Sequence, residues 1–358
     1  EDENEYDYEY EYDVEHEFEY ECEGEGEDES VSDIEEAREF FRLQEQRLSE
    51  SGMLPAVEER AGEEEETFSP EEARRLLWET EEMKQPVIGY KILEKLGGGG
   101  SGAVFKALQM ATKTEVALKL LYPELHDDPK SLQEFVREGV TLIKINHPNI
   151  LRGIDFGFSK GFYFMVLEFV EGHSIAHFIE SGKRTREAEA ARIAAQILGA
   201  LDYLAQKGIV HRDVKPGNIL IVDRKVAKLC DFGLCLDRKR LDQKKEQEET
   251  TCGTVEYISP EQALGRTDLD VRSDLYSLGA SLFQMISGHL PFNGPTGRDI
   301  MEKHIKLPVD FTGYETLFSQ PMRQVLLKMM AKERDGRYES AKAALADLDA
   351  IYGLKGGP

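Results

Sequence analysis

The stretch HRDVKPGN occupies residues 211–218, and a second motif, DFG, stands at residues 231–233. Transfer of a phosphoryl group asks for little covalent chemistry from a protein, because positioning and charge neutralisation carry most of the catalysis. It does need a carboxylate that can accept a hydroxyl proton, and an amide and a second carboxylate that can hold Mg²⁺. Asp213, Asn218 and Asp231 supply these groups within one short segment. The two motifs at this distance therefore predict a phosphotransferase site.

A glycine-rich run lies upstream, where residues 96–104 read LGGGGSGAV. Gly97, Gly99 and Gly102 fit the spacing GxGxxGxV, and glycine lets backbone amides approach phosphate oxygens because it has no Cβ atom. Four consecutive glycines are also compatible with a linker, and a dinucleotide-binding fingerprint would fit if a helix followed. Residues 103–107 read as a strand instead. We therefore expect the glycines to cap a hairpin over a nucleotide.

A lysine and a glutamate lie between these motifs. Lys119 follows three apolar residues of a strand-like run, and Glu138 stands nineteen residues later in a helical pattern. An ion pair between them would hold the lysine ammonium against the α- and β-phosphates of ATP. Each residue alone is also compatible with an ordinary solvated charge, so the predicted pair depends on the catalytic motifs that follow.

The apolar pattern divides this part of the chain into two. Strand-like runs occupy residues 90–96, 104–108, 115–120 and 162–169, and a helical pattern occupies residues 131–144. Beyond residue 172 the pattern is mainly helical, at residues 187–207, 273–287, 322–331 and 340–351. A β-rich part followed by a larger helical part predicts an α+β protein of two lobes with a cleft between them.

Most of the negative charge belongs to an N-terminal leader. The net charge of the chain is −26, and residues 1–30 alone hold 17 acidic and no basic side chains. Aromatic and small residues alternate with these carboxylates, but repulsion without a compensating cation favours disorder over a strand. We expect a disordered acidic tail at residues 1–32, followed by short helices and an acidic linker at residues 33–84.

Cysteine content and hydropathy argue against a disulfide-built protein and against a membrane-spanning one. Four cysteines are too few for a disulfide-built scaffold of 358 residues, and their spacing matches no zinc site. Reduced thiols in a cytoplasmic protein are the expected state. No apolar run approaches the roughly 20 residues that a membrane-spanning helix needs. We expect neither a membrane segment in this chain nor a nucleic-acid partner.

From about residue 88 to about residue 352, the sequence resembles the eukaryotic-type serine/threonine protein kinases. It is most similar to the bacterial branch, of which SPEQA at residues 259–263 and RSDLYSLG at residues 272–279 are typical. The resemblance implies a bilobal protein kinase fold at residues 85–353, with a β-rich N-lobe at about 88–170 and a helical C-lobe at about 171–353. It also implies a signalling enzyme that uses ATP and Mg²⁺, with Mn²⁺ as a substitute.

The resemblance further implies a role for individual residues. Nucleotide binding falls to Gly97, Gly99, Gly102, Val104, Ala117, Lys119, Glu168 and Val170. Catalysis falls to Lys119, Glu138, Asp213 and Lys215, and metal binding to Asn218 and Asp231. Leu167 matches the gatekeeper beside the adenine, and the hinge follows it.

Three structural expectations come from the same resemblance. Glu261 would pair with Arg337, and Asp274 would brace the catalytic loop. Gly153 departs from the family pattern, because an apolar side chain usually stands there. That side chain would join an internal hydrophobic stack, which we expect here to include Leu142, His211 and Phe232.

Substrate choice and regulation are implied as well. Lys215, two residues after Asp213, and Thr254 match kinases that act on serine and threonine hydroxyls of proteins. Thr250 lies where the family often carries a regulatory threonine, with Thr251 as the second candidate and Arg212 as the partner of the phosphate. Autophosphorylation there would involve a transient dimer.

Two alternatives stay open at this point. One is a catalytically weak or inactive kinase fold, a scaffold whose acidic leader binds basic partners. Loss of Lys119, Asp213 or Asp231 would favour it, and all three are present. The other is a small-molecule kinase, against which the SPE motif of protein-directed kinases argues. Ser174 and Gln284 stand where basophilic kinases carry acidic residues, which argues against a strong preference for upstream arginine.

Overall fold

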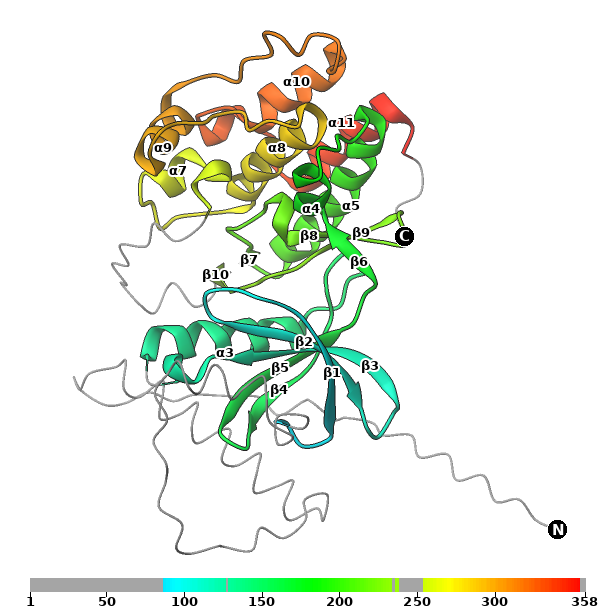
Figure 1. Ribbon diagram of the computed structural model, residues 1–358. Helices are drawn as coiled ribbons and strands as arrows, with labels where there is room; N and C mark the ends of the chain where they lie inside the picture. Colours follow the sequence, from blue (N-terminus) through cyan, green and yellow to red (C-terminus); the bar gives the residue numbers. More distant parts are fainter. Residues whose placement is uncertain (1–85, 127, 234–235, 238–253, 355–358) are drawn as a thin grey trace, which may run out of the picture.

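A computed structural model describes residues 86–126, 128–233, 236–237 and 254–354. The expected tail and linker at residues 1–84, and the candidates Thr250 and Thr251, lie outside this part of the chain. The described residues form a sheet-rich lobe and a helical lobe (Figure 1). The two-lobed α+β architecture predicted from the sequence is confirmed.

The N-lobe is an antiparallel sheet with one long helix beside it. Its strands are β1 (Tyr90–Gly98), β2 (Gly102–Gln109), β3 (Thr114–Leu121), β4 (Gly153–Ser159) and β5 (Phe162–Glu168). They lie in the order β1-β2-β3-β5-β4, so β3 is central and β4 is an edge strand. Helix α3 (Pro129–Lys144) begins where the Asp128 carboxylate accepts the Ser131 N–H, with proline at the first helical position. It packs beside β4.

Successive side chains of β5 point to opposite faces of the sheet, so the strand contributes to two separate apolar clusters. Tyr163, Met165 and Leu167 join the large core that also contains the buried side chains of α3. Phe164 and Val166 join a smaller core with the buried residues of β1 and β2. A strand with both faces buried explains why residues 162–169 are almost uninterruptedly apolar.

The C-lobe is built from helices around α8. Its elements are β6 (Gly172–Ser174), α4 (Ile175–Glu180), α5 (Glu187–Gln206), β7 (Ile209–Val210), β8 (Ile219–Val222), β9 (Val226–Leu229), β10 (Leu236–Asp237), α7 (Pro260–Ala263), α8 (Val271–Ser287), α9 (Gly297–Lys306), α10 (Gln320–Met329) and α11 (Ala341–Tyr352). Fourteen of the 17 residues of α8 are buried, so this helix is the centre of the lobe. Within the described residues, no helix is long and apolar enough to cross a membrane.

The sequence interpretation missed two elements that matter below. Strand β4 contains Gly153, Asp155 and Gly157, residue types that are depleted in strands. Helix α9 begins at Gly297, and five of its ten residues are charged, although Thr296 and Asp299 form a capping box at its start. In both cases neighbouring elements, and not local propensity, decide the structure.

Two glycines allow α3 and β4 to approach closely. A Cβ atom at Gly153 would lie 2.8 Å from the backbone carbon of Leu142, and one at Gly139 would lie 3.0 Å from the ring of Phe156. Leu142 itself is buried, as are His211 and Phe232, whose rings meet edge to face at 4.8 Å. The helix therefore occupies the space that a side chain at position 153 would need.

This contact predicts the result of enlarging Gly153. Gly153→Ala should lower the melting temperature, Tm, by several degrees, since overpacking a close contact typically costs about 1–3 kcal/mol. Gly199→Ala in α5 is the matched control, because the nearest atom to its added Cβ lies 3.9 Å away. Its Tm should stay constant or rise, since alanine favours a helix over glycine. A Gly153→Ala protein as stable as the wild type in thermal unfolding would contradict the close approach.

Candidate active site

The glycine-rich run forms the tip of a hairpin, as the sequence predicts. Strands β1 and β2 pair antiparallel with Gly97 opposite Val104, and the N–H of Gly99 donates to the carbonyl of Gly102 at 2.9 Å. A Cβ atom at Gly102 would overlap the carbonyl oxygen of Leu120, so packing against β3 requires glycine there. A Cβ at Gly97 or Gly99 would meet no described atom within 4 Å. That side of the tip is open for the backbone to approach a ligand.

Lys119 and Glu138 form the predicted ion pair between β3 and α3. The Lys119 ammonium donates to both carboxylate oxygens of Glu138, at 2.9 and 2.7 Å. Burial opposes the lysine charge, but the carboxylates of Glu138 and Asp231 outweigh it and raise the pKa of Lys119. The ammonium therefore stays charged, between the helix on one side and the second motif on the other.

The walls expected around an adenine ring come from β2, β3 and β5. Val104 pairs with Lys119 across the sheet, and Ala117 pairs with Leu167, the expected gatekeeper. The Glu168 carboxylate accepts from the Lys228 ammonium at 2.7 Å and from the Arg152 N–H at 2.9 Å. Because its side chain is engaged there, Glu168 would meet a nucleotide through its backbone.

The catalytic loop holds Asp213 through two of its own neighbours. The Asn218 amide donates to Asp213 Oδ2 at 2.8 Å and to the Asp213 carbonyl at 2.9 Å. The Lys215 ammonium lies 2.6 Å from the same carboxylate oxygen. It also donates to the Thr254 hydroxyl at 2.7 Å. One carboxylate is thus oriented by an amide and a cation, and the cation reaches the segment that follows residue 253.

Asn218 and Asp231 suit a divalent metal ion. The Asn218 nitrogen is used on Asp213, which leaves the amide oxygen as the group available for a metal. Asp231 adopts a left-handed backbone conformation, with φ of 64°. Mg²⁺ prefers hard oxygen ligands and is usually held by one or two carboxylates together with substrate phosphates. The donor set fits that preference.

Residues of α8 and α7 hold the catalytic loop, residues 211–218, in place. Asp274 accepts the N–H of His211 at 2.9 Å and the N–H of Arg212 at 2.8 Å. The Gln262 amide donates to the Arg212 carbonyl at 2.9 Å. Arg212 has φ of 70°, a conformation that non-glycine residues rarely adopt, so these bonds support a strained turn.

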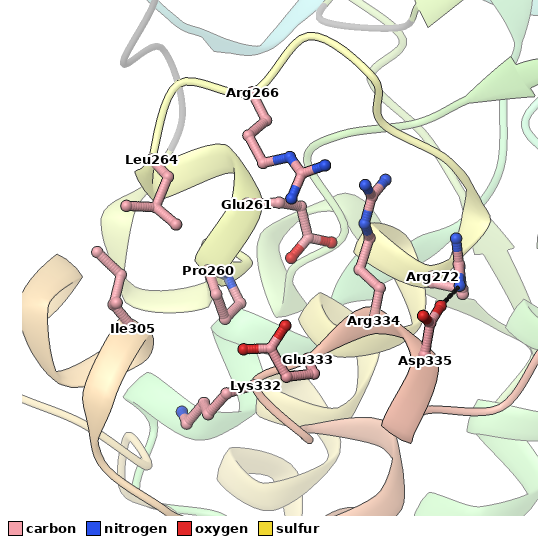
Figure 2. Close-up of a pocket in the computed structure, with 10 residues that line it drawn as sticks. All are labelled: Pro260, Glu261, Leu264, Arg266, Arg272, Ile305, Lys332, Glu333, Arg334 and Asp335. Atoms are coloured by element: carbon pink, nitrogen blue, oxygen red, sulfur yellow. Dashed lines mark hydrogen bonds and ion pairs between the residues drawn. The ribbon is translucent and has the colours of Figure 1, made fainter.

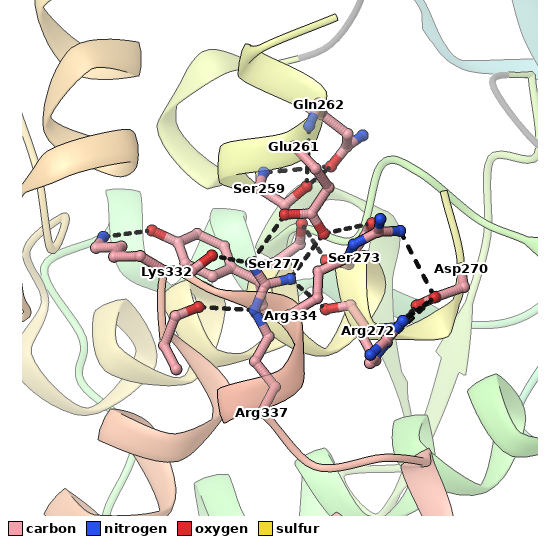
Figure 3. A network of polar contacts seen from close by, with 12 residues as sticks. Ser259, Glu261, Gln262, Asp270, Arg272, Ser273, Ser277, Lys332, Arg334 and Arg337 are labelled. Atoms are coloured by element: carbon pink, nitrogen blue, oxygen red, sulfur yellow. Dashed lines mark hydrogen bonds and ion pairs between the residues drawn. The ribbon is translucent and has the colours of Figure 1, made fainter. Parts of the chain in front are cut away.

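Helix α7 is held in turn by a buried ion pair with Arg337. Arg337 donates to both oxygens of Glu261, at 2.7 and 2.8 Å, and both residues are buried. The Ser273 hydroxyl donates to Glu261 at 2.7 Å, and Arg337 also donates to the carbonyl of Ala331 at 2.7 Å (Figure 3). A bidentate pair with these additional bonds meets the condition under which buried charges are tolerated. The predicted contact between Glu261 and Arg337 is present.

Of the sequence-predicted site residues, the structure brings Lys119 together with Glu138, and Asp213 together with Lys215 and Asn218. It also adds two contacts that the sequence interpretation missed, from Lys228 to Glu168 and from Lys215 to Thr254. A lysine in the strand-like run before DFG gives no signal beyond a solvated charge, because its partner is sixty residues away. Thr254 was identified only as a marker of hydroxyl choice.

A glycine hairpin, a lysine–glutamate pair and an aspartate bonded to the Asn218 amide form the arrangement that the sequence resemblance to protein kinases predicts. The model of the protein kinase domain matches residues 90–347, and the chain belongs to this family. The match covers β1 to α11, so it includes every residue of the described cleft.

The curated relatives include bacterial serine/threonine kinases. The chain is 33% identical to the serine/threonine-protein kinase PrkC of Bacillus subtilis, over 74% of this chain and 40% of that protein. It is 34% identical to the kinase pkn3 of Myxococcus xanthus, over 73% of this chain and 50% of that protein. For PknB of Mycolicibacterium smegmatis the identity is 33%, over 74% and 43%. The chain therefore spans half or less of the length of these relatives.

The ion pair in the cleft predicts a difference between two glutamates of the N-lobe. Glu138→Gln should lower Tm and raise the KM for ATP at least about tenfold, because breaking a buried pair costs on the order of 3–5 kcal/mol. Glu115→Gln is the matched control: Glu115 is half exposed and lies 2.9 Å from Lys106 on the same sheet. Solvent screens a pair at the surface, so this variant should resemble the wild type in both measurements. Equal KM values for ATP in the two variants would argue against a role of Glu138 in the cleft.

Proposed function

We propose that this chain transfers the γ-phosphate of ATP to serine and threonine hydroxyls of protein substrates. The observation that carries the proposal is the shared contact of Lys215, whose ammonium touches both the Asp213 carboxylate and the Thr254 hydroxyl. It joins the expected base to the segment along which a protein substrate would bind. The names of the bacterial relatives point to the same hydroxyl class.

In the proposed reaction, the residues of the cleft divide the work between binding and proton transfer. Gly97, Gly99 and Gly102 would cover the phosphates, and Lys119 would hold the α- and β-phosphates from its pair with Glu138. The remaining contacts with the nucleotide would come from Val104, Ala117, Glu168 and Val170. A divalent ion, when bound, neutralises phosphate charge, and Asn218 and Asp231 would hold it. We expect Mg²⁺ to serve, with Mn²⁺ as a substitute.

Asp213 would take the proton from the attacking hydroxyl. The bonds from Asn218 and Lys215 both end on Oδ2, so the carboxylate is oriented before a substrate arrives. Lys215, which carries a positive charge next to Asp213, would stabilise the charge that develops on the transferred phosphoryl group. Both residues act through fixed geometry, and neither forms a covalent intermediate.

The two positions at which basophilic kinases carry acidic residues hold no carboxylate in this chain. Ser174 caps the start of α4 with its hydroxyl, and the Gln284 oxygen accepts from the Tyr257 hydroxyl. We therefore propose protein substrates without a strong requirement for upstream arginine. The alternative of an inactive scaffold is less favourable, because Lys119, Glu138 and Asp213 already have the partners that catalysis requires.

Two substitutions test the proposed chemistry. Asp213→Asn should lower kcat about 100- to 10,000-fold, the usual contribution of a general base, while binding of ATP changes little. Asp231→Ala should abolish transfer, because it removes a metal ligand. The measurement is phosphate transfer from ATP·Mg²⁺ to a generic basic protein, with nucleotide binding by calorimetry as the control. Equal phosphorylation by the wild type and both variants would contradict the proposed function.

We also propose that phosphorylation at Thr250 or Thr251, by transient pairing of two chains, regulates the activity. Arg212 lies directly before Asp213, and a phosphate adds about −1.5 to −2 charges that an arginine can bind. Intact-mass and peptide mapping after incubation with ATP should place phosphate on one of these threonines. The Thr250→Ala, Thr251→Ala double variant should lose activity. Full activity of the double variant, with no phosphate between residues 231 and 261, would refute this regulation.

A further inference from the structure

A chain of buried polar groups connects α8 and α9 with the segment beside the catalytic loop. Tyr276 and His304 are both fully buried. The Nε2 atom of His304 lies 3.0 Å from the carbonyl oxygen of Glu256, and its Nδ1 atom lies 3.0 Å from the Tyr276 hydroxyl. The Lys332 ammonium donates to the Tyr276 hydroxyl at 3.0 Å and to the His304 carbonyl at 2.7 Å.

The chemistry of these groups fixes the protons of the histidine. A backbone carbonyl can only accept, so Nε2 of His304 carries the hydrogen and donates it to Glu256. Nδ1 then accepts from the Tyr276 hydroxyl, whose oxygen accepts from Lys332. Burial and the charge of Lys332 lower the pKa of His304 to about 4, so the ring is neutral near pH 7. The Tyr276 hydroxyl also lies 3.3 Å from the His304 carbonyl oxygen, a second and longer contact.

The contact with Glu256 reaches a part of the chain that adjoins the catalytic groups. Glu256 belongs to the short 3-10 helix Val255–Tyr257, which directly follows Thr254. Thr254 contacts Lys215, and Tyr257 donates to Gln284 at 2.5 Å. Under the proposed function, a protein chain whose hydroxyl reaches Asp213 would lie close to this segment, because Lys215 contacts both Asp213 and Thr254. His304 therefore holds the middle of the segment while Thr254 and Tyr257 hold its two sides.

A pocket of about 270 Å³ borders the same network. Lys332 and Ile305, the residue after His304, line it together with residues of α7 and the segment 333–335 (Figure 2). None of the catalytic or nucleotide-binding candidates described above is among its lining residues. The network thus lies between this outer pocket and the segment at residues 254–257.

We propose that His304 is a positioning residue for the protein substrate, acting through its Nε2–H bond to the Glu256 backbone. This inference rests on the proposed kinase function. The bond fixes the surface against which residues next to the acceptor hydroxyl bind. It contacts neither the nucleotide walls nor the metal-binding pair, so it governs the binding of the protein substrate and leaves ATP binding unaffected.

The test compares two substitutions of His304 in the full chain. His304→Leu removes both ring nitrogens and should raise the KM for a generic basic protein roughly tenfold, the scale of one buried hydrogen bond. The KM for ATP should change less than about twofold. His304→Gln retains a side-chain N–H that can donate to Glu256 and should recover most of the loss. Hydrogen exchange of the backbone amides of residues 255–258 should increase in His304→Leu and less in His304→Gln.

A pair of tyrosine variants controls for the loss of a buried hydroxyl. Tyr276→Phe should raise the KM for the protein substrate, because Nδ1 of His304 loses its donor. Tyr338→Phe removes a 2.8 Å bond to Asp347 elsewhere in the lobe and should leave that KM unchanged. Unchanged KM for the protein substrate in His304→Leu, or an equal increase of both KM values, would overturn the inference. If the wild type transferred no phosphate, the proposed function would fail, and unchanged amide exchange in His304→Leu would independently reject the positioning role.

Discussion

The rest of the site depends on the hydrogen bonds that the Asp274 carboxylate accepts from the catalytic loop, residues 211–218. Asp274 is 1% exposed, inside the most buried helix of the lobe, and it binds two consecutive N–H groups of the catalytic loop. Burial raises the pKa of Asp274 to about 7, and the two donors act in the opposite direction. A buried carboxylate without such donors would be costly, and a loop with Arg212 in a left-handed conformation would be strained without the carboxylate. The Asp274 carboxylate and the loop therefore stabilise each other, and together they fix the position of Asp213.

Helix α7, which contacts the catalytic loop, is held by a buried ion pair. Arg337 and Glu261 anchor α7, and Gln262 of the same helix donates to the carbonyl of Arg212. The catalytic loop is therefore held at its N–H groups by α8 and at a carbonyl by α7. Since α7 also lies beside α9, the contact of His304 with Glu256 belongs to the same assembly. The Glu256 backbone and the loop that carries Asp213 are thus held by neighbouring helices that contact each other.

The contacts of Asp213 with Lys215 and Asn218 could be anticipated from the sequence because the three residues are close together in the chain. Asp213, Lys215 and Asn218 lie within six residues, so their types and spacing identify the site without knowledge of the fold. The two lobes followed from the change in apolar pattern. Strand β4 escaped prediction because its glycines suit a close helix contact that only the tertiary structure reveals. The environment of His304 escaped for a related reason: its partners Glu256, Tyr276 and Lys332 come from three distant segments, and a charged helix gives no sign that one histidine is buried.

The bond between Glu168 and Lys228 has a mechanical consequence for the cleft. Glu168 ends strand β5 at the connection between the lobes, whereas Lys228 belongs to β9 and stands three residues before Asp231. The connection is thus clamped to the helical lobe at its first residue. Glu168 also pairs with Val116 of β3, so an opening of the two lobes would strain or break a contact on one side of Glu168 or the other. Val104, Ala117 and Lys119 all lie on β2 and β3, so the walls expected around adenine would move together with the glycine hairpin and Lys119 relative to Asp231.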